Sequence, residues 1–165
     1  MDDKRISITE LRQQQKRHWP EMYRATNPAV LSIIRAGDQF IKETNAALQA
    51  AQLTGAEFDV LATLRRQAEP YRLSPTELCK AMLFSSGGLT KVLHRLQNAN
   101  LILRPENPED GRSLLVQLSP EGIKLSDELC AVIGPLHRSR LAKLDKKEQA
   151  TLSHLLEKAF AKDGD

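Results

Sequence analysis

Hydrophobic residues recur at helical spacing along most of the chain, and each helical stretch begins at a recognisable start signal. A long helix is expected over about 28–51, because Asn27 and Pro28 form an N-cap followed by proline at the first helical position. A second helix is expected after Thr54, which forms a capping-box pattern with Glu57, and this helix is expected to end at the Glu69-Pro70 pair. Their apolar positions are Val30, Ile33, Ile34, Ile41 and Leu48 in the first helix and Phe58, Leu61, Ala62 and Leu64 in the second.

The next two predicted helices are separated only by a tight turn. A capping box at Ser74 and Glu77 opens a short helix. The segment SSGGLTKVLHRL (85–96) then predicts a helix capped by Ser85 or Ser86, ending near 98–100. Two helices joined in this way form a helix-turn-helix.

After residue 100 the hydrophobic pattern shortens to strand length. The segments 101–105 and 113–118 are apolar and branched, and the polar segment 106–112 between them predicts a hairpin. Two further helices are expected, one after Ser119 and one after Asp145. The predicted fold class is therefore mainly α with a small β-hairpin, a winged helix-turn-helix lobe with long terminal helices.

These elements predict the following division of the chain. Residues 1–27 form a polar N-terminal extension, and 28–165 form one domain. Within it we expect the winged helix-turn-helix at 54–118, flanked by dimerisation helices at 28–51 and 120–165. The flanking helices carry more apolar surface than a lobe of this size covers, so we expect a homodimer.

Composition narrows the setting. The 165 residues are 41% hydrophobic but only 4% aromatic, which suits an aliphatic helical core. We expect no membrane span and no secretory signal, hence a cytoplasmic protein. The net charge of +3 is uninformative, but residues 85–104 contain Lys91, Arg95 and Arg104 and no acid, a local bias that attracts phosphate.

Several motifs together resemble the MarR (multiple antibiotic resistance regulator) family of winged-helix transcription factors. They are FDVLATL (58–64), RLSPTEL (72–78), SSGGLTKVLHRL (85–96), NPEDGRSLLVQLSPEG (107–122) and LDKKEQATLSHLL (144–156). The resemblance covers nearly the whole chain from about residue 28. It implies a homodimeric, sequence-specific DNA-binding regulator, usually a repressor, whose partner is double-stranded DNA with a palindromic operator.

The resemblance also implies which residues contact DNA. A recognition helix points its N-terminal residues at base edges, and small residues there let helix amides approach a phosphate. Wing arginines of the family enter the minor groove, held by an aspartate. The expected DNA-binding residues are Ser85, Ser86, Gly87, Thr90, Lys91, Arg95, Asp110 and Arg112. Two plainer alternatives stay open: Gly87 and Gly88 serve only close packing in the turn, and the wing tip is an ordinary solvated hairpin.

An effector site is implied by a subgroup of the family that responds to urate. Its effector residues fall on Trp19, Asp59 and Arg104, but Val92 stands where that subgroup has an arginine. Because guanidinium pairs bidentately with carboxylate, we expect a small aromatic or phenolic anion. The alternative is structural: Trp19 covers the end of the dimer helices, and Asp59 makes a hydrogen bond or ion pair.

Other reactive side chains give no positive support for an enzyme. Cys79 and Cys130 lie in apolar helical patterns, and we expect both to be buried small hydrophobes. No metal ligand set is expected from the four scattered histidines, and no cofactor. Two alternative functions remain, a winged-helix protein-interaction module without DNA binding and a small thiol-based sensor or enzyme.

Overall fold

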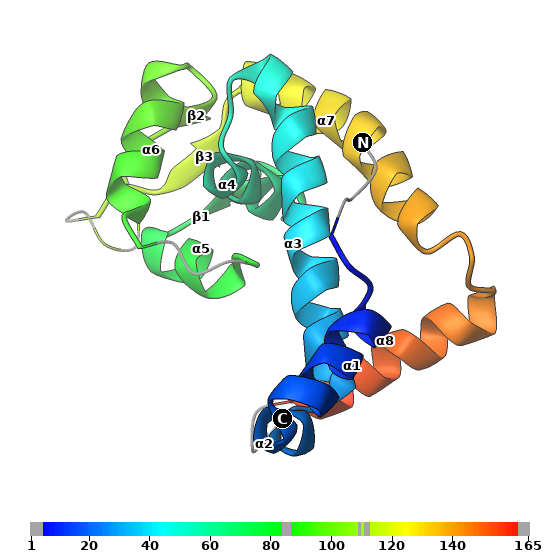
Figure 1. Ribbon diagram of the computed structural model, residues 1–165. Coiled ribbons are helices and arrows are strands. Elements are labelled where there is room, and N and C mark those ends of the chain that lie inside the picture. Colours follow the sequence, from blue (N-terminus) through cyan, green and yellow to red (C-terminus); the bar gives the residue numbers. More distant parts are fainter. Residues whose placement is uncertain (1–4, 84–86, 109, 111–112, 162–165) are drawn as a thin grey trace. The chain divides into compact units, whose positions relative to one another are not determined.

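The computed structural model describes residues 5–83, 87–108, 110 and 113–161 (Figure 1). Within these residues it is mainly helical, with a small sheet. The helices are α1 (Ile8–His18), α2 (Pro20–Ala25), α3 (Pro28–Leu48), the 3-10 turn η1 (Gln49–Ala51), α4 (Gly55–Arg65), α5 (Pro75–Ala81), α6 (Leu89–Asn98), α7 (Pro120–Arg140) and α8 (Lys146–Phe160). The strands are β1 (Arg72–Leu73), β2 (Ile102–Leu103) and β3 (Val116–Leu118). This confirms the predicted fold class.

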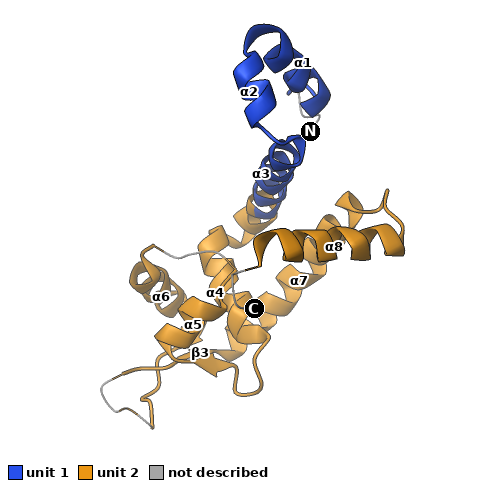
Figure 2. Cartoon of the chain, turned by 90° about the horizontal axis from the view of Figure 1, so that it is seen from below, with its two compact units in different colours: residues 1–44 blue, residues 45–165 orange. Residues whose placement is uncertain are grey.

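The chain divides into two compact units, residues 1–44 and residues 45–165 (Figure 2). In the first unit α1 packs on α2, and the side chain of Arg12 links the two helices. Its guanidinium lies 4.0 Å from the centre of the Tyr23 ring and donates hydrogen bonds to the carbonyl oxygens of Tyr23 (2.9 Å) and Thr26 (2.8 Å). The short connection between the two helices falls at Trp19, as the Trp19-Pro20 pair predicts.

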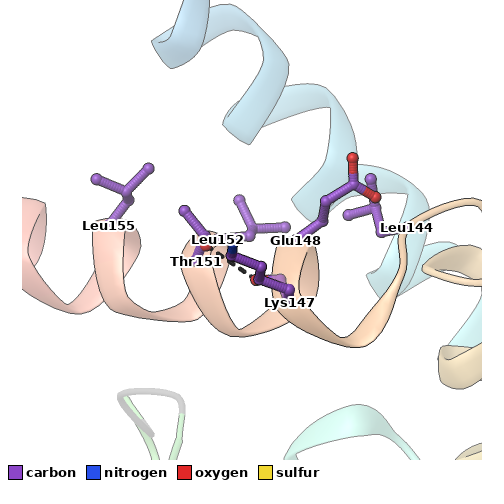
Figure 3. Close-up of a pocket in the computed structure, with 6 residues that line it drawn as sticks. All are labelled: Leu144, Lys147, Glu148, Thr151, Leu152 and Leu155. Carbon is purple, nitrogen blue, oxygen red and sulfur yellow. Dashed lines mark hydrogen bonds between the residues drawn. The ribbon is translucent and has the colours of Figure 1, made fainter.

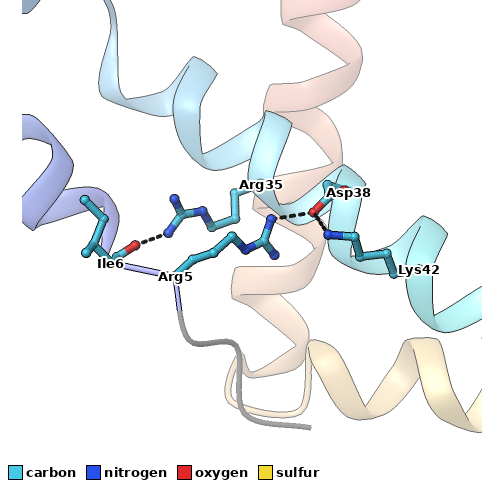
Figure 4. Close-up of polar contacts among 5 residues, drawn as sticks. All are labelled: Arg5, Ile6, Arg35, Asp38 and Lys42. Atoms are coloured by element: carbon cyan, nitrogen blue, oxygen red, sulfur yellow. Dashed lines mark hydrogen bonds and ion pairs between the residues drawn. The ribbon is translucent and has the colours of Figure 1, made fainter.

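Residues 5 and 6 are tied to α3 by polar contacts (Figure 4). The carboxylate of Asp38 binds Lys42 at 2.9 Å and Arg5 at 2.5 Å, and Arg35 donates to the carbonyl oxygen of Ile6. Hydrogen bonds from Lys42 and then Arg5 lower the pKa of the Asp38 carboxyl below its ordinary value of 3.8.

The second unit contains a three-stranded antiparallel sheet with strand order β1-β3-β2. The β2–β3 hairpin was predicted, and Ile102 pairs with Leu118 in it. Strand β1 was not predicted. Its two residues, Arg72 and Leu73, pair with Gln117 and Val116, so the wing is joined to the segment before α5.

The core of this unit packs α4, α5 and α6 against the sheet. Its buried residues are Val60, Leu61, Leu64, Leu78, Leu93, Leu96, Leu101, Ile102, Val116 and Leu118. A second, smaller cluster joins Leu48 to Leu129 and Ile133 of α7. The aliphatic composition predicted from the sequence is therefore the composition of the core.

The start of α7 lies against the connection between α6 and β2. Ser119 caps α7 by accepting a hydrogen bond from the amide of Gly122, and its hydroxyl donates to the carbonyl oxygen of Asn100 at 2.6 Å. The amide of Ser119 donates to the carbonyl oxygen of Leu101 at 3.1 Å. A Cβ at Gly122 would lie 2.1 Å from that oxygen, so glycine is required for this close approach.

The predicted capping boxes at 54–57, 74–77 and 145–148 are all present. Two expectations are wrong. Helix α4 ends at Arg65 and not at the Glu69-Pro70 pair, because Arg66 begins a series of turns. Cys79 and Cys130 are exposed. Each directly follows a buried leucine, Leu78 or Leu129, and a helix turns about 100° per residue, so the cysteine side chain points away from the core. Among the described residues, no helix is long and apolar enough to cross a membrane.

Candidate nucleic-acid interface

Helix α6 has one face in the core and one face in solvent. Leu93 and Leu96 are buried, and α4 packs against both α5 and α6. The exposed residues of α6 are Thr90, Lys91, His94, Arg95, Gln97 and Asn98. A helix held from behind by leucines and presenting polar side chains outward has the form of a recognition helix.

His94, Gln97 and Asn98 also belong to this face, although they were not predicted as DNA-binding residues. Their signal was available, because they follow Thr90 and Lys91 at helical spacing. The side chains of His94 and Asn98 contact each other at 3.3 Å, from His94 Nδ1 to Asn98 Nδ2. The exposed polar face therefore runs the full length of α6.

The N-terminus of α6 differs from the prediction. Its N-cap is Gly88, with φ 97° and ψ 28°, and no side chain caps it. The expected caps, Ser85 and Ser86, lie outside the described residues. Glycine suits this position because other residues adopt a left-handed backbone only at a cost. The N-cap prediction failed because a glycine in this conformation starts the helix without a hydroxyl.

None of the described residues packs closely against the two glycines before α6. A Cβ added at Gly87 or Gly88 would meet no described atom within 4 Å, and both residues are exposed. At Gly88 the backbone conformation requires glycine, because φ is 97°. A helix end without a side-chain cap leaves amide groups that an anion can bind.

The wing beyond the sheet is held by backbone hydrogen bonds. Glu106 and Leu114 form a β-bridge, and the Asp110 carbonyl oxygen accepts from the amide of Ser113 at 3.0 Å. The Asp110 amide donates to the carbonyl oxygen of Asn107 at 3.2 Å. Asp110 is exposed at this turn. Arg112, the expected minor-groove residue, lies outside the described residues.

Arg95 is less available to DNA than the sequence suggested. Its Nε lies 2.9 Å from Oε1 of Glu57, and the Arg95 side chain is 54% exposed. Glu57 is 3% exposed and belongs to α4, which lies behind the recognition helix. The structure therefore gives one edge of the Arg95 guanidinium a partner within the lobe.

Asp59 and Arg104, two of the three expected effector residues, have different hydrogen-bond partners. Asp59 is 5% exposed and accepts a hydrogen bond from the amide of Leu83 at 3.3 Å. Arg104 donates from Nε to the carbonyl oxygen of Leu115 at 3.0 Å and from Nη2 to that of Leu114 at 3.2 Å. Trp19 belongs to the first unit and is 58% exposed. Asp59 thus binds the segment that follows α5, and Arg104 stabilises the wing by hydrogen bonds to its backbone.

Comparison with known families and proteins was consistent with this geometry. The family model for the MarR family matches residues 51–113. The transcriptional regulator PecS of Dickeya dadantii is 34% identical over 105 residues, which are 64% of this chain and 63% of PecS. The alignment thus spans slightly less than two thirds of PecS. The multiple antibiotic resistance protein MarR of Escherichia coli is 34% identical over 117 residues, covering 70% of this chain and 79% of MarR.

Solved structures agree with these sequence matches. A mutant MarR from Escherichia coli, in complex with operator DNA, superposes with a TM-score of 0.71 at 30% identity, covering 81% of this chain and 94% of that chain. BpsR from Bordetella bronchiseptica, whose DNA binding is regulated by 6-hydroxynicotinic acid, superposes with a TM-score of 0.69 at 26% identity, covering 79% and 91%. With the sequence identity, the matched family model and the winged helix-turn-helix in agreement, the chain belongs to the MarR family.

Proposed function

We propose that this protein is a cytoplasmic, sequence-specific DNA-binding transcriptional regulator, acting as a repressor. The observation that carries the proposal is the exposed polar face of α6, with Thr90 and Lys91 in its first turn and the leucines Leu93 and Leu96 behind it. That arrangement suits insertion into the major groove, with the wing reaching the neighbouring minor groove. In this proposal 54–118 is the DNA-binding lobe.

The proposed DNA contacts divide into two kinds. Lys91 neutralises a phosphate and so contributes affinity that falls with salt. Thr90 and His94, on the same exposed face, are candidates for base edges. Arg112 contacts the minor groove, where an arginine responds to groove width and potential more than to base identity. In this proposal Ser85, Ser86 and Gly87, which precede α6 in the sequence, contact the DNA backbone.

We also propose a homodimer built from the terminal helices, 28–51 and 120–165, with residues 1–27 as an extension. Support comes from α8, where a hollow of about 390 Å³ follows one side of the helix (Figure 3). Its apolar lining is Leu144, Leu152 and Leu155, and Leu155 is 55% exposed. Apolar side chains of this kind on a long helix suit a two-fold interface. A two-fold dimer in turn matches a palindromic operator.

Regulation is proposed to occur through a small organic anion. BpsR provides the support, since its regulator, 6-hydroxynicotinic acid, is an aromatic acid of the chemical class that a guanidinium binds. The candidate residues are Arg104, Asp59 and Trp19. A ligand that prefers a conformation unable to bind DNA lowers operator affinity by its differential binding. Arg104→Ala should then release DNA much less in response to aromatic carboxylates.

The test is a fluorescence anisotropy titration with a labelled duplex that the wild-type protein selects from a random-sequence library. Affinity should fall linearly with salt on logarithmic axes, and Lys91→Ala should lower that slope by about one unit for each subunit. Arg112→Ala should weaken binding as well. Lys16→Ala is the matched control, because Lys16 is exposed on α1, outside α6, the wing and the proposed dimerisation helices. Wild-type affinity in both Lys91→Ala and Arg112→Ala would refute the assignment.

A further inference from the structure

The carboxylate of Glu57 joins the start of α4 to the recognition helix. Its Oε2 accepts hydrogen bonds from the amide of Thr54 at 2.7 Å and from the Thr54 hydroxyl at 2.8 Å. Its Oε1 lies 2.9 Å from Nε of Arg95 in α6. The two oxygens therefore serve two different helices, and a carboxylate that is 3% exposed needs both sets of partners.

Comparison with the other capping boxes of the chain separates capping from this second role. Glu77 accepts the amide and the hydroxyl of Ser74, and Glu148 accepts the amide of Asp145. Both glutamates are exposed, so water can solvate the rest of each carboxylate. Capping alone does not require burial. The burial of Glu57 and its contact with Arg95 are therefore additional to its capping function.

The Arg95–Glu57 contact fixes the rotation and axial position of α6, which the apolar contacts of the core do not fix. Leu93 and Leu96 hold α6 by apolar contacts, which are not directional. The Arg95–Glu57 pair is directional, because the guanidinium presents its N–H groups in a rigid plane. Lys91 precedes Arg95 by one turn on the same side of α6. A rotation or slide of α6 that broke the pair would thus also move the residue proposed to contact phosphate.

We infer that Arg95 is a positioning residue of the recognition helix, contributing to operator affinity by binding buried Glu57 and not by neutralising a phosphate. The inference rests on the proposed function, and it replaces the direct DNA contact that the sequence suggested for Arg95. Substitution of Glu57 tests the inference more decisively than substitution of Arg95. A carboxylate makes no attractive contact with DNA phosphate, so its removal weakens binding only by disturbing α6.

The experiment repeats the salt-dependent anisotropy titration on the same selected duplex with Glu57→Gln, Arg95→Gln and the double variant. Each single variant should weaken binding by about tenfold, the size expected for one ion-pair network. The salt slope should stay at the wild-type value in all three. The double variant should bind no more weakly than either single variant, because both changes remove one interaction. Lys91→Ala is the comparison, and its slope should fall by about one unit for each subunit.

Far-UV circular dichroism before each titration shows that the variants are folded, so a loss of stability alone leaves the measured affinity unchanged. A slope lowered by about one unit for each subunit in Arg95→Gln, or wild-type affinity in Glu57→Gln, would overturn the inference. If Glu57→Gln does not fold, the slope of Arg95→Gln alone decides. If the DNA affinity of the wild-type protein does not depend on salt, the proposed function itself is wrong. This result is distinct from those that overturn only the positioning role of Arg95.

Discussion

Gly122 provides the strongest prediction about stability, because its environment leaves no room for a single methyl group. In Gly122→Ala the new Cβ would lie 2.1 Å from the carbonyl oxygen of Leu101, 3.0 Å from its carbonyl carbon and 3.2 Å from Cδ2 of Leu118. Carbon and oxygen in favourable contact lie ~3.3–3.6 Å apart, so the two backbone segments must separate by about 1 Å. No side-chain rotation can relieve a clash with a carbonyl oxygen.

The expected cost follows from the contacts that this separation disturbs. Overpacking costs up to ~3 kcal/mol, and the upper end applies because the obstacle is backbone. The same carbonyl of Leu101 accepts the amide of Ser119, a hydrogen bond of about 1 kcal/mol. Alanine returns up to ~1 kcal/mol through its higher helix propensity. The net loss of unfolding free energy is therefore about 3 kcal/mol.

Urea unfolding followed by circular dichroism measures this loss, with all variants at one protein concentration because a dimer's stability depends on it. Gly134→Ala is the matched control on the same helix. Its Cβ would lie 3.3 Å from Nη1 of Arg138, the mobile end of a flexible side chain, so a gain of about 0.5–1 kcal/mol is expected. A Gly122→Ala midpoint at or above that of the wild-type protein would refute the reasoning.

Three further predictions follow from other parts of the structure. NMR titration of the Asp38 carboxyl should give a midpoint below pH 3.8, and a higher midpoint in Lys42→Ala. The contribution of Asp38 to folding stability is present above pH 3.8 and is lost as pH falls through the lowered pKa of the folded state. Cys79 is exposed and should react with a maleimide without denaturant. Cys79→Ser and Cys130→Ser should retain wild-type DNA affinity and effector response. If peroxide releases the wild-type protein from DNA and either substitution abolishes that release, the prediction is wrong. Leu155→Glu should raise the dimer dissociation constant about 30-fold or more, from ~1 kcal/mol of lost burial in each subunit, and light scattering showing an intact micromolar dimer would count against the proposed interface.

Features determined by neighbouring residues could be predicted from the sequence. The capping boxes at Thr54, Ser74 and Asp145 each involve residues three positions apart, so their residue types suffice to predict a helix start. The β2–β3 hairpin could be predicted for the same reason. Strand β1 could not, because Arg72 and Leu73 become a strand only by pairing with distant Gln117 and Val116.

In the candidate site, too, features set by neighbouring residues could be predicted from the sequence, whereas contacts between distant residues could not. Thr90 and Lys91 follow from helical periodicity, and the structure exposes both. Glu57 was recognised only as a capping residue, because nothing near it in the sequence indicates that its second oxygen binds Arg95. The burial of the cysteines was mispredicted because a helix turns about 100° per residue, so a position beside a buried leucine can face solvent.

In the proposed complex, a two-fold dimer binds DNA with two copies of α6. Hydroxyl-radical footprinting tests this arrangement on a fragment that the wild-type protein selects from a random-sequence library. Two protected regions should appear, related by the two-fold axis of a palindromic site and centred about one helical turn, ~10 base pairs, or a multiple of it apart. At one protein concentration, Lys91→Ala should weaken the protection of both regions equally, because each copy of α6 loses the same phosphate contact. A single protected region without symmetry, or no protection at saturating wild-type protein, would contradict the account.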